Sequence, residues 1–270
     1  MQLFTTYFST ALHVCKHSMA LITLKARASQ VTIETQLQRA LSTPLLTSEN
    51  RDGLLPVARS LPKRSPLLIS LAPDLLDLKI ITLPAELSRS EQKKYIGQKL
   101  SLTNASLNYR EVLLTPPTLF TATLEKQKIR SLVTFLKKCR LTPSAIYTIP
   151  LVIQQLLPHA QEPHLFISQH DVHYTIGYVS QNTLQNYFCV ESKEIDEIFA
   201  AITAQNISPK QIWLGTEPSI TTQFSLLIEK KFKFSAKSLF DIPFSSRNTV
   251  LSTGLGNAAL LAYWGLHGKC

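Results

Sequence analysis

"LSTGLGNAALLAYWGL", residues 251–266, contains Gly254, Gly256 and Ala259 at the spacing G-x-G-x-x-A that is typical of dinucleotide-binding loops. That fingerprint lies inside a βαβ unit and needs an acidic residue about 20 positions further on. Only residues 267–270 follow the stretch in this sequence, so we expect no dinucleotide site here. The small residues instead predict a C-terminal helix that lies close against a sheet.

The composition indicates a globular protein that favours acidic partners. Among the 270 residues, 44% are hydrophobic and 17% are charged, which is typical of a folded chain. Lys and Arg outnumber Asp and Glu by 28 to 18, and the net charge of +10 suits a nucleic acid, an anionic membrane surface or an acidic peptide. The charge alone does not choose among these three partners.

Cysteine usage and hydropathy predict a soluble cytoplasmic protein without a zinc site. No Cys-x-x-Cys pair occurs, and no histidine lies at ligand spacing from the four cysteines, Cys15, Cys139, Cys189 and Cys270. We therefore expect thiols in a reducing compartment. No run of 18 apolar residues is present, and the N-terminal segment lacks the basic start of a signal peptide.

The order of predicted elements repeats in the two halves of the chain. Residues 7–37 and 164–191 each predict a three-strand meander. Strands and helices follow each meander, including a helix over 125–140 with Ile129, Leu132, Val133 and Leu136 on its buried face. Pro158 and Pro163 mark the boundary between the halves. The sequence therefore predicts two α/β lobes of like topology, residues 1–158 and 159–270.

Three stretches resemble the actin-like PilM family of type IV pilus assembly proteins. They are residues 67–114, which include a helix with a Ser88–Glu91 capping box, residues 133–157, and "GLGNAAL" at 254–260. The resemblance is to the short, divergent members tied to competence and DNA uptake, often called ComA or HofM. It implies a two-lobed actin-like (ribonuclease H-like) fold. It also implies an inserted βαββα-type subdomain near 84–148 and a C-terminal helix near the interlobe cleft.

The same resemblance implies a function and a partner. The chain is expected to be a cytoplasmic component of a type IV (competence) pilus assembly platform, peripheral at the inner membrane. Its expected partner is the N-terminal cytoplasmic tail of a PilN-like inner-membrane protein. The family binds this tail in a groove between the first-lobe core and the inserted subdomain. The resemblance, together with residue chemistry, predicts partner-binding roles for Lys93, Lys94, Tyr95 and Tyr109.

The resemblance also raises the question of ATP, which PilM proteins bind between the lobes with hairpins that begin Asp-Ile-Gly. Here His13 stands at the Asp position and Cys15 at the Gly position, and the second hairpin has Ser168 or Gln169 in place of the Asp. The other degenerate nucleotide positions are Gly215, Thr216 and Gly254. An imidazole does not serve Mg²⁺ as a carboxylate does. We therefore expect a degenerate ATPase with no cofactor, no metal and no catalytic residue.

Two alternatives remain open at this stage. A register shift that restores Asp171 to the Asp position would favour an active ATPase of the pilus or type II secretion machinery, with ATP and Mg²⁺. The predicted helix over 125–140 has a basic face, formed by Lys126, Arg130, Lys137 and Lys138. Together with a second basic run, Lys230, Lys231 and Lys233, this face would suit a DNA-binding competence accessory. Aromatic residues do not interleave with these charges, so we expect no direct nucleic-acid binding.

The histidines offer no catalytic site in the sequence. His170 and His173 flank Asp171 on a predicted hairpin turn, where solvated polar side chains are ordinary, and no G-x-S-x-G motif accompanies Ser168. We expect His159 and His164 to lie at the surface near the boundary between the lobes.

Overall fold

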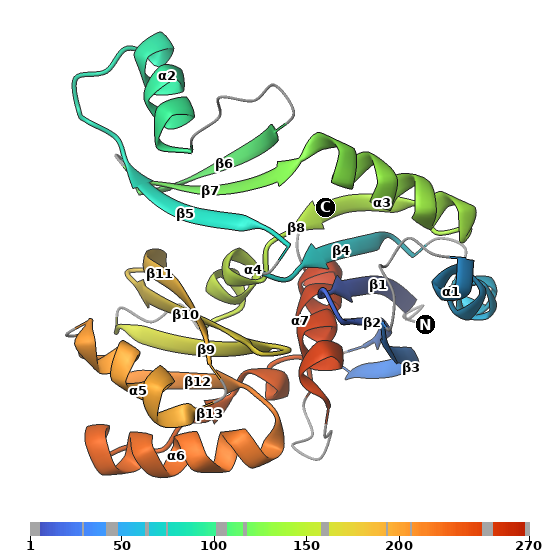
Figure 1. Ribbon diagram of the computed structural model, residues 1–270. Helices are drawn as coiled ribbons and strands as arrows, with labels where there is room; N and C mark the ends of the chain where they lie inside the picture. Colours follow the sequence, from blue (N-terminus) through green and yellow to red (C-terminus); the bar gives the residue numbers. More distant parts are fainter. Residues whose placement is uncertain are drawn as a thin grey trace.

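The computed structural model shows two lobes with a helix between them and a smaller sheet above (Figure 1). It describes residues 6–28, 30–41, 48–62, 65–73, 75–100, 107–115, 118–157, 162–192, 194–205, 207–244 and 251–267. Side chains at 48–51, 53 and 107–115 are outside this description. Two five-stranded sheets form the lobes, and the third sheet has three strands.

The sheet of the first lobe has the strand order β3-β2-β1-β4-β8. Strands β1 to β3 form the predicted antiparallel meander, and β4 and β8 add in parallel. The strands are β1 (Thr6–Val14), β2 (Ser18–Arg27), β3 (Gln30–Ala40), β4 (Leu67–Leu71) and β8 (Pro143–Tyr147). The helices of this lobe are α1 (Ser48–Ser60), α3 (Lys126–Lys138) and α4 (Ile149–Leu156).

Both faces of this sheet are buried at its centre, where β1, β2 and β4 also carry buried polar side chains such as Ser9, Thr23 and Ser70. Leu12 on β1 packs in one core with residues of α1 and α3, whereas the adjacent Ala11 packs in another core with residues of α4 and α7 (Thr253–His267). Successive side chains of a strand point to opposite faces. The sheet is therefore covered on both faces.

The second lobe repeats this topology with the order β11-β10-β9-β12-β13. Its strands are β9 (His164–His170), β10 (His173–Ser180), β11 (Thr183–Glu191), β12 (Gln211–Gly215) and β13 (Lys237–Ser238). One face packs on α5 (Ile195–Ala204) and α6 (Pro218–Phe232). Phe166 on the other face belongs to the core that also holds residues of α4 and α7.

The C-terminal helix α7 follows the second lobe in sequence but packs against the sheet of the first lobe (Figure 1). A Cβ atom at Gly265 would collide with Leu68 of β4, and one at Gly256 would collide with Phe240 in the short 3₁₀ segment Leu239–Asp241. Ala258, Ala259 and Ala262 are fully buried. The small residues of this stretch therefore serve close packing, as predicted.

The third sheet, with the order β5-β7-β6, belongs to a subdomain inserted in the first lobe. Its strands are β5 (Asp77–Thr82), β6 (Leu107–Thr115) and β7 (Thr118–Glu125), and α2 (Arg89–Lys99) lies between β5 and β6 in sequence. The predicted capping box of α2 is present, with the Ser88 amide donating to Glu91 Oε2 at 2.9 Å.

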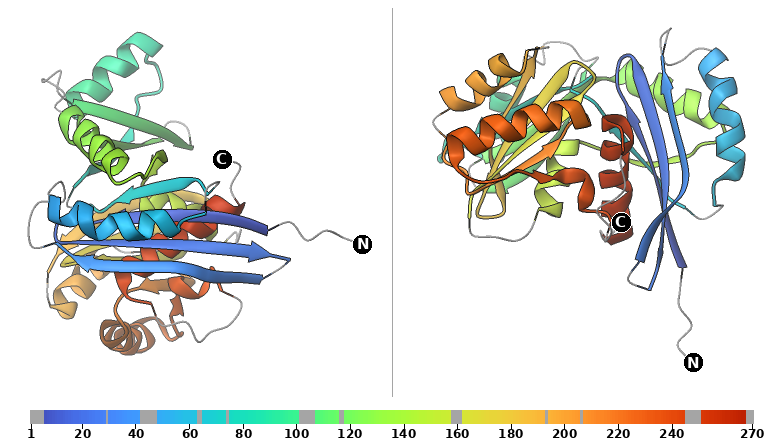
Figure 2. Two further views of the ribbon diagram at one scale, coloured as in Figure 1. Left: turned by 90° about the vertical axis from the view of Figure 1, so that its right-hand side faces the viewer. Right: turned by 90° about the horizontal axis from the view of Figure 1, so that it is seen from below.

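The limits of this insert differ from the expected 84–148. β5 precedes residue 84 but pairs with β7 in the third sheet, and β8, which ends at Tyr147, pairs with β4 in the first sheet. The insert is therefore the series β5–α2–β6–β7–α3. Helix α3 buries Leu132, Phe135 and Leu136 in the core of the first lobe. This packing attaches the insert to that lobe (Figure 2).

Candidate functional site

Two equivalent hairpins, one from each lobe, meet in the cleft between the lobes. In the hairpin β1–β2, His13 pairs with Ala20, and in β9–β10, Ser168 pairs with Thr175. Each pair spans seven positions (20 − 13 and 175 − 168), so His13 and Ser168 are equivalent in the two lobes. By the same count, Cys15 and His170 are equivalent.

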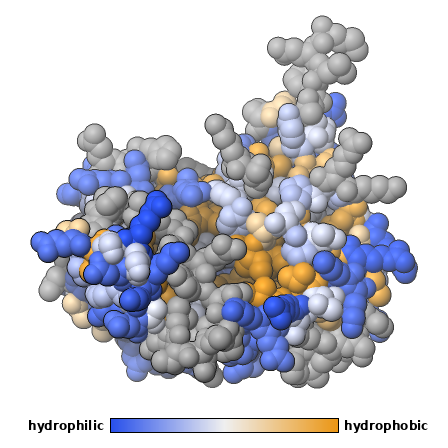
Figure 3. Space-filling model, turned by 90° about the horizontal axis from the view of Figure 1, so that it is seen from above, coloured by the Kyte–Doolittle hydropathy of each residue, from blue (hydrophilic) through white to orange (hydrophobic). Residues whose placement is uncertain are grey.

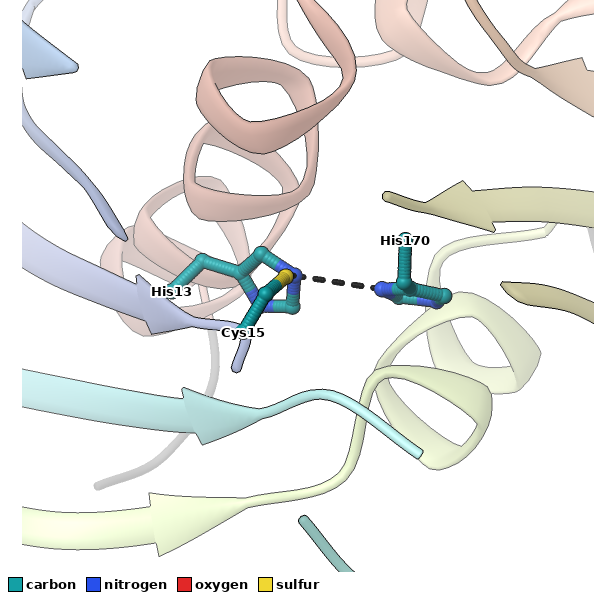
Figure 4. Close-up of side chains that lie close together, drawn as sticks. All are labelled: His13, Cys15 and His170. Carbon is teal, nitrogen blue, oxygen red and sulfur yellow. Dashed lines mark hydrogen bonds between the residues drawn. The ribbon is translucent and has the colours of Figure 1, made fainter. Parts of the chain in front are cut away.

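Side chains of the two hairpins touch each other directly across this cleft (Figure 4). His13 Nε2 lies 3.1 Å from His170 Nδ1, and Cys15 Sγ lies 3.4 Å from His13 Nε2. The Ser18 hydroxyl donates to Asp171 Oδ1 at 2.8 Å. The exposed fractions of His13, Cys15 and His170 are only 1%, 3% and 1%. The lobes therefore close on one another through a buried His–His–Cys cluster.

Neighbouring polar groups hold the two imidazole rings in place. His13 Nδ1 lies 2.8 Å from the Ser70 hydroxyl, because β1 and β4 are parallel and place these residues side by side. Asn257 of α7 accepts a hydrogen bond from Ser168 at 2.9 Å and donates one to the Gln169 carbonyl at 3.0 Å. These two bonds orient its amide, so that Asn257 Nδ2 faces His170 Nδ1 at 3.3 Å.

Both rings of the cluster are uncharged at neutral pH. Burial lowers the pKa of His13 to about 3. Burial also lowers the pKa of His170 well below its usual value, helped by His13 and His173. Removal from water disfavours the charged imidazolium, so each ring keeps a nitrogen lone pair for a hydrogen bond or a ligand.

A cavity of about 230 Å³ adjoins the cluster. It is lined by His13, Cys15, Ser18, Gln38, Gln169, His170, Asp171, Glu217, Thr253 and Gly254. Pockets for drug-sized ligands occupy roughly 300–1,000 Å³. Two imidazoles and a thiol are poor ligands for Mg²⁺, which prefers oxygen. His13, Cys15 and His170 therefore do not supply the oxygen ligands that Mg²⁺ prefers, although the carboxylates of Asp171 and Glu217 also line the cavity.

Of the other positions predicted from the nucleotide motifs, some line this cavity and others do not. Gly254 lines it, whereas Ser168 is not among the lining residues and donates a hydrogen bond to Asn257. Gly215 and Thr216 lie at the end of β12, where the Thr216 hydroxyl is 2.8 Å from that of Thr221. Asp171 lines the cavity from the turn after β9.

The predicted partner-binding residues lie on the insert. Lys93 and Lys94 are exposed on α2, and the half-buried Tyr95 follows them. Tyr109 lies on β6 opposite Thr123 of β7, and its side chain is outside the described residues. Among the side chains of this set that the structure describes, Tyr95 lines a groove.

That groove, of about 530 Å³, runs between the insert and the second lobe. Its walls are residues 78–82 of β5, Tyr95 and Lys99 of α2, and Asn186 and Tyr187 of β11. The expected groove lay between the insert and the first-lobe core. At that place, helix α3 packs against the first-lobe core. The insert also contacts the second lobe, where the rings of Phe120 on β7 and Tyr187 on β11 meet edge-on with 5.8 Å between their centroids.

Two expectations about histidines are wrong. His170 is buried in the cleft and is not solvated on a turn, because β9 extends through it and the turn begins at Asp171. His164 is also buried, and its Nδ1 accepts a hydrogen bond from Trp213 Nε1 at 3.1 Å. His159 lies outside the described residues. Ser168 and His170 are two positions apart in an apolar strand, so their side chains point to the same face of the sheet. This spacing could have predicted that both are buried.

Comparisons with known proteins identify the fold. The sequence matches no protein-family model and no curated protein. Its structure is similar to a chain of the PilM–PilN type IV pilus biogenesis complex, with a TM-score of 0.69 and 11% identity, over 96% of this chain and 98% of that one.

Two further solved structures have the same architecture. The cytoplasmic domain of EpsL, an inner membrane component of the type II secretion system of Vibrio cholerae, matches with a TM-score of 0.59 and 13% identity, over 97% of this chain and 96% of that one. A Bacteroides thetaiotaomicron protein with an actin-like ATPase fold and unknown function matches with a TM-score of 0.56 and 12% identity, over 86% of this chain and 90% of that one. The chain therefore has the predicted two-lobed, actin-like α/β fold.

Proposed function

We propose that this chain is a scaffold of a type IV pilus or related secretion assembly platform that binds the N-terminal cytoplasmic tail of a PilN-like inner-membrane protein. The likeness to a chain of the PilM–PilN complex over nearly the full length of both chains carries this proposal. The likeness to the cytoplasmic domain of EpsL supports a role at the inner membrane. None of the described helices is long and apolar enough to cross a membrane, so the attachment proposed here is peripheral and goes through the partner.

The groove between the insert and the second lobe is the proposed seat of the tail. β5 is an edge strand of the third sheet, and five consecutive residues of it, 78–82, line the groove. An extended peptide can add main-chain hydrogen bonds to such an edge. The rings of Tyr95 and Tyr187 offer flat apolar surfaces on the other walls.

The charges at this groove favour an acidic group on the peptide. Lys79 and Lys99 both line it. The ammonium group of Lys99 lies 5.4 Å from the centre of the Tyr95 ring, while Lys79 pairs with Asp77 at 2.8 Å. Seen from the side of the third sheet, apolar residues also gather in a hollow, with hydrophilic residues around it (Figure 3). Such a face suits a protein partner.

The proposal includes neither ATP hydrolysis nor DNA binding. The cleft where the family binds ATP holds a buried His–His–Cys cluster and a small cavity, which supports a non-enzymatic role. The two basic runs lie on α3 and α6, on opposite sides of the molecule (Figure 1). They do not form one surface for a nucleic acid.

The test is calorimetric titration with a synthetic peptide that carries the N-terminal tail of a PilN-like protein from the same organism. Tyr95→Ala should weaken binding by about fivefold or more, because a buried aromatic anchor typically contributes more than 1 kcal/mol. Tyr7→Ala, at a 60% exposed tyrosine on β1, is the matched control and should bind like wild type. Thermal melting must first show that both variants are folded.

The outcomes separate the site from the function. If a folded Tyr95→Ala variant binds the peptide as tightly as wild type, this groove is not the binding site, but the proposed partner is still supported. If the wild-type chain binds no such tail, the proposed function itself is wrong.

A further inference from the structure

We propose that His13, Cys15 and His170 form a transition-metal site, for Zn²⁺ or a similar ion, that joins the two lobes across the cleft. Each residue offers one ligand atom, and these atoms all lie within 4.8 Å of one another. His13 and Cys15 come from the first lobe and His170 from the second. The inference rests on this cluster alone and is independent of the proposed partner.

The spacing of the ligand atoms matches tetrahedral coordination. With Zn–N distances of about 2.0–2.1 Å and a Zn–S distance of about 2.3 Å, two nitrogens lie about 3.3 Å apart and a nitrogen and a sulfur about 3.6 Å apart. The distance from His13 Nε2 to His170 Nδ1 is 3.1 Å, and that from Cys15 Sγ to His13 Nε2 is 3.4 Å. The remaining pair, Cys15 and His170, needs to close by at most about 1.2 Å.

The hydrogen bonds around the rings suggest which nitrogens carry lone pairs in the cleft. The amide of Asn257 faces His170 Nδ1 with its nitrogen, so this ring nitrogen accepts. When His13 donates its Nδ1 proton to the Ser70 hydroxyl, its Nε2 also presents a lone pair, 3.1 Å from the first. Two lone pairs at this distance repel each other unless a proton or a cation lies between them. Ser70 thus resembles the second-shell groups that orient a metal-bound histidine through its other ring nitrogen, whereas the Asn257 amide contacts the His170 nitrogen that would itself bind the metal.

The chemistry of the cluster selects the class of metal. Two neutral imidazoles and a thiolate are preferred by Zn²⁺ and Co²⁺, and they suit Mg²⁺ and Ca²⁺ poorly. The low histidine pKa values keep both rings available as ligands at neutral pH. The fourth position opens on the adjoining cavity, where Asp171 Oδ2 is buried without a hydrogen-bond partner among the described residues. Its charge would offset the single positive charge of a zinc–thiolate unit.

The sequence did not indicate this site because its ligands are far apart along the chain. His13 and His170 are separated by 157 positions, and the local ligand spacings that mark zinc sites are absent. Because the ligands come from both lobes, metal binding would hold the cleft closed.

The experiment is titration of the chelator-treated full-length chain with Zn²⁺ or Co²⁺ as the only added metal. We expect one equivalent per chain, a higher melting temperature with Zn²⁺, and the thiolate-to-metal charge-transfer band of a cobalt–cysteine site. Cys15→Ser should abolish that band and weaken binding by at least tenfold. Ser70→Ala should weaken binding about 10- to 100-fold, the range seen for outer-shell partners.

Cys189→Ser is the matched control, because Cys189 is exposed on β11, and it should keep both band and affinity. His170→Gln provides a second ligand variant should Cys15→Ser not fold. On the wild-type chain, Zn²⁺ should also protect Cys15 from alkylation by more than tenfold while leaving Cys189 reactive. Absence of stoichiometric binding by both metals, or equal binding by a folded Cys15→Ser variant, would overturn the proposal.

Discussion

His13 and His170 couple the stability of the protein to pH, because both are buried as neutral rings. The folded-state pKa of His13, about 3, is below its usual value of 6.5, and that of His170 is also well below 6.5. Well above pH 6.5, neither the folded nor the unfolded chain carries these protons. As the pH falls below 6.5, the unfolded chain takes up protons that the folded chain does not, so the free energy of unfolding decreases.

We expect this loss to reach at most about 1.4 kcal/mol per pH unit for each histidine, and to begin near pH 6.5. Urea denaturation of the metal-free chain between pH 7.5 and 5 measures this loss of unfolding free energy. Most carboxyl groups titrate below this pH range. His13→Gln should show a flatter pH dependence, whatever its stability at pH 7.5. His17→Gln, at the exposed tip of the same hairpin, should keep the wild-type slope. Equal slopes for the two variants would contradict the assignment.

Helix α3 shows how far periodicity defines an element. The predicted span of 125–140 and the buried Leu132 and Leu136 are confirmed by a helix over Lys126–Lys138, with Ile129 and Val133 only half-buried. The predicted buried face did not include Phe135, whose side chain is only 6% exposed. A regular i, i+3, i+4, i+7 series marks the middle of a buried face, whereas its width depends on what packs against it. Here α1 and the first sheet cover a wider face.

Leu132→Ala should therefore lower the free energy of unfolding by about 2–5 kcal/mol, since it removes a side chain that is 5% exposed and leaves a cavity. Lys137→Ala, on the exposed face of the same helix, should change it by no more than about 0.5 kcal/mol. Chemical denaturation of both variants tests the register of the helix. Similar losses at the two positions would show that the register is wrong.

The closed contact between the lobes has a consequence for nucleotides. Mg·ATP would have to displace the His13–His170 and Ser18–Asp171 contacts, and it would meet side chains at both positions where the family has glycine, Cys15 and His170. We predict no measurable ATP hydrolysis and weak or absent Mg·ATP binding by the metal-free chain. Phosphate release and calorimetry measure these two properties. A submicromolar dissociation constant for Mg·ATP would instead favour the active ATPase.

Local chemistry in the sequence was sufficient to predict much of the fold. The two meanders, the capping box at Ser88 and the close packing of Gly256 depend on residues near one another in sequence or on side-chain size alone. The resemblance to PilM proteins then supplied the architecture that these elements share. The same resemblance predicted that His13 and Cys15 stand where PilM proteins have nucleotide-binding residues.

Only the tertiary structure decided what those side chains meet. The contact of His13 with His170 spans 157 positions and depends on how two lobes close. The assignment of β5 to the insert depends on its pairing with β7, and the groove at Tyr95 depends on β11 of the other lobe. Periodicity reports which face of an element is apolar, but it carries no information on which distant element covers that face. A site built between lobes is therefore decided by packing.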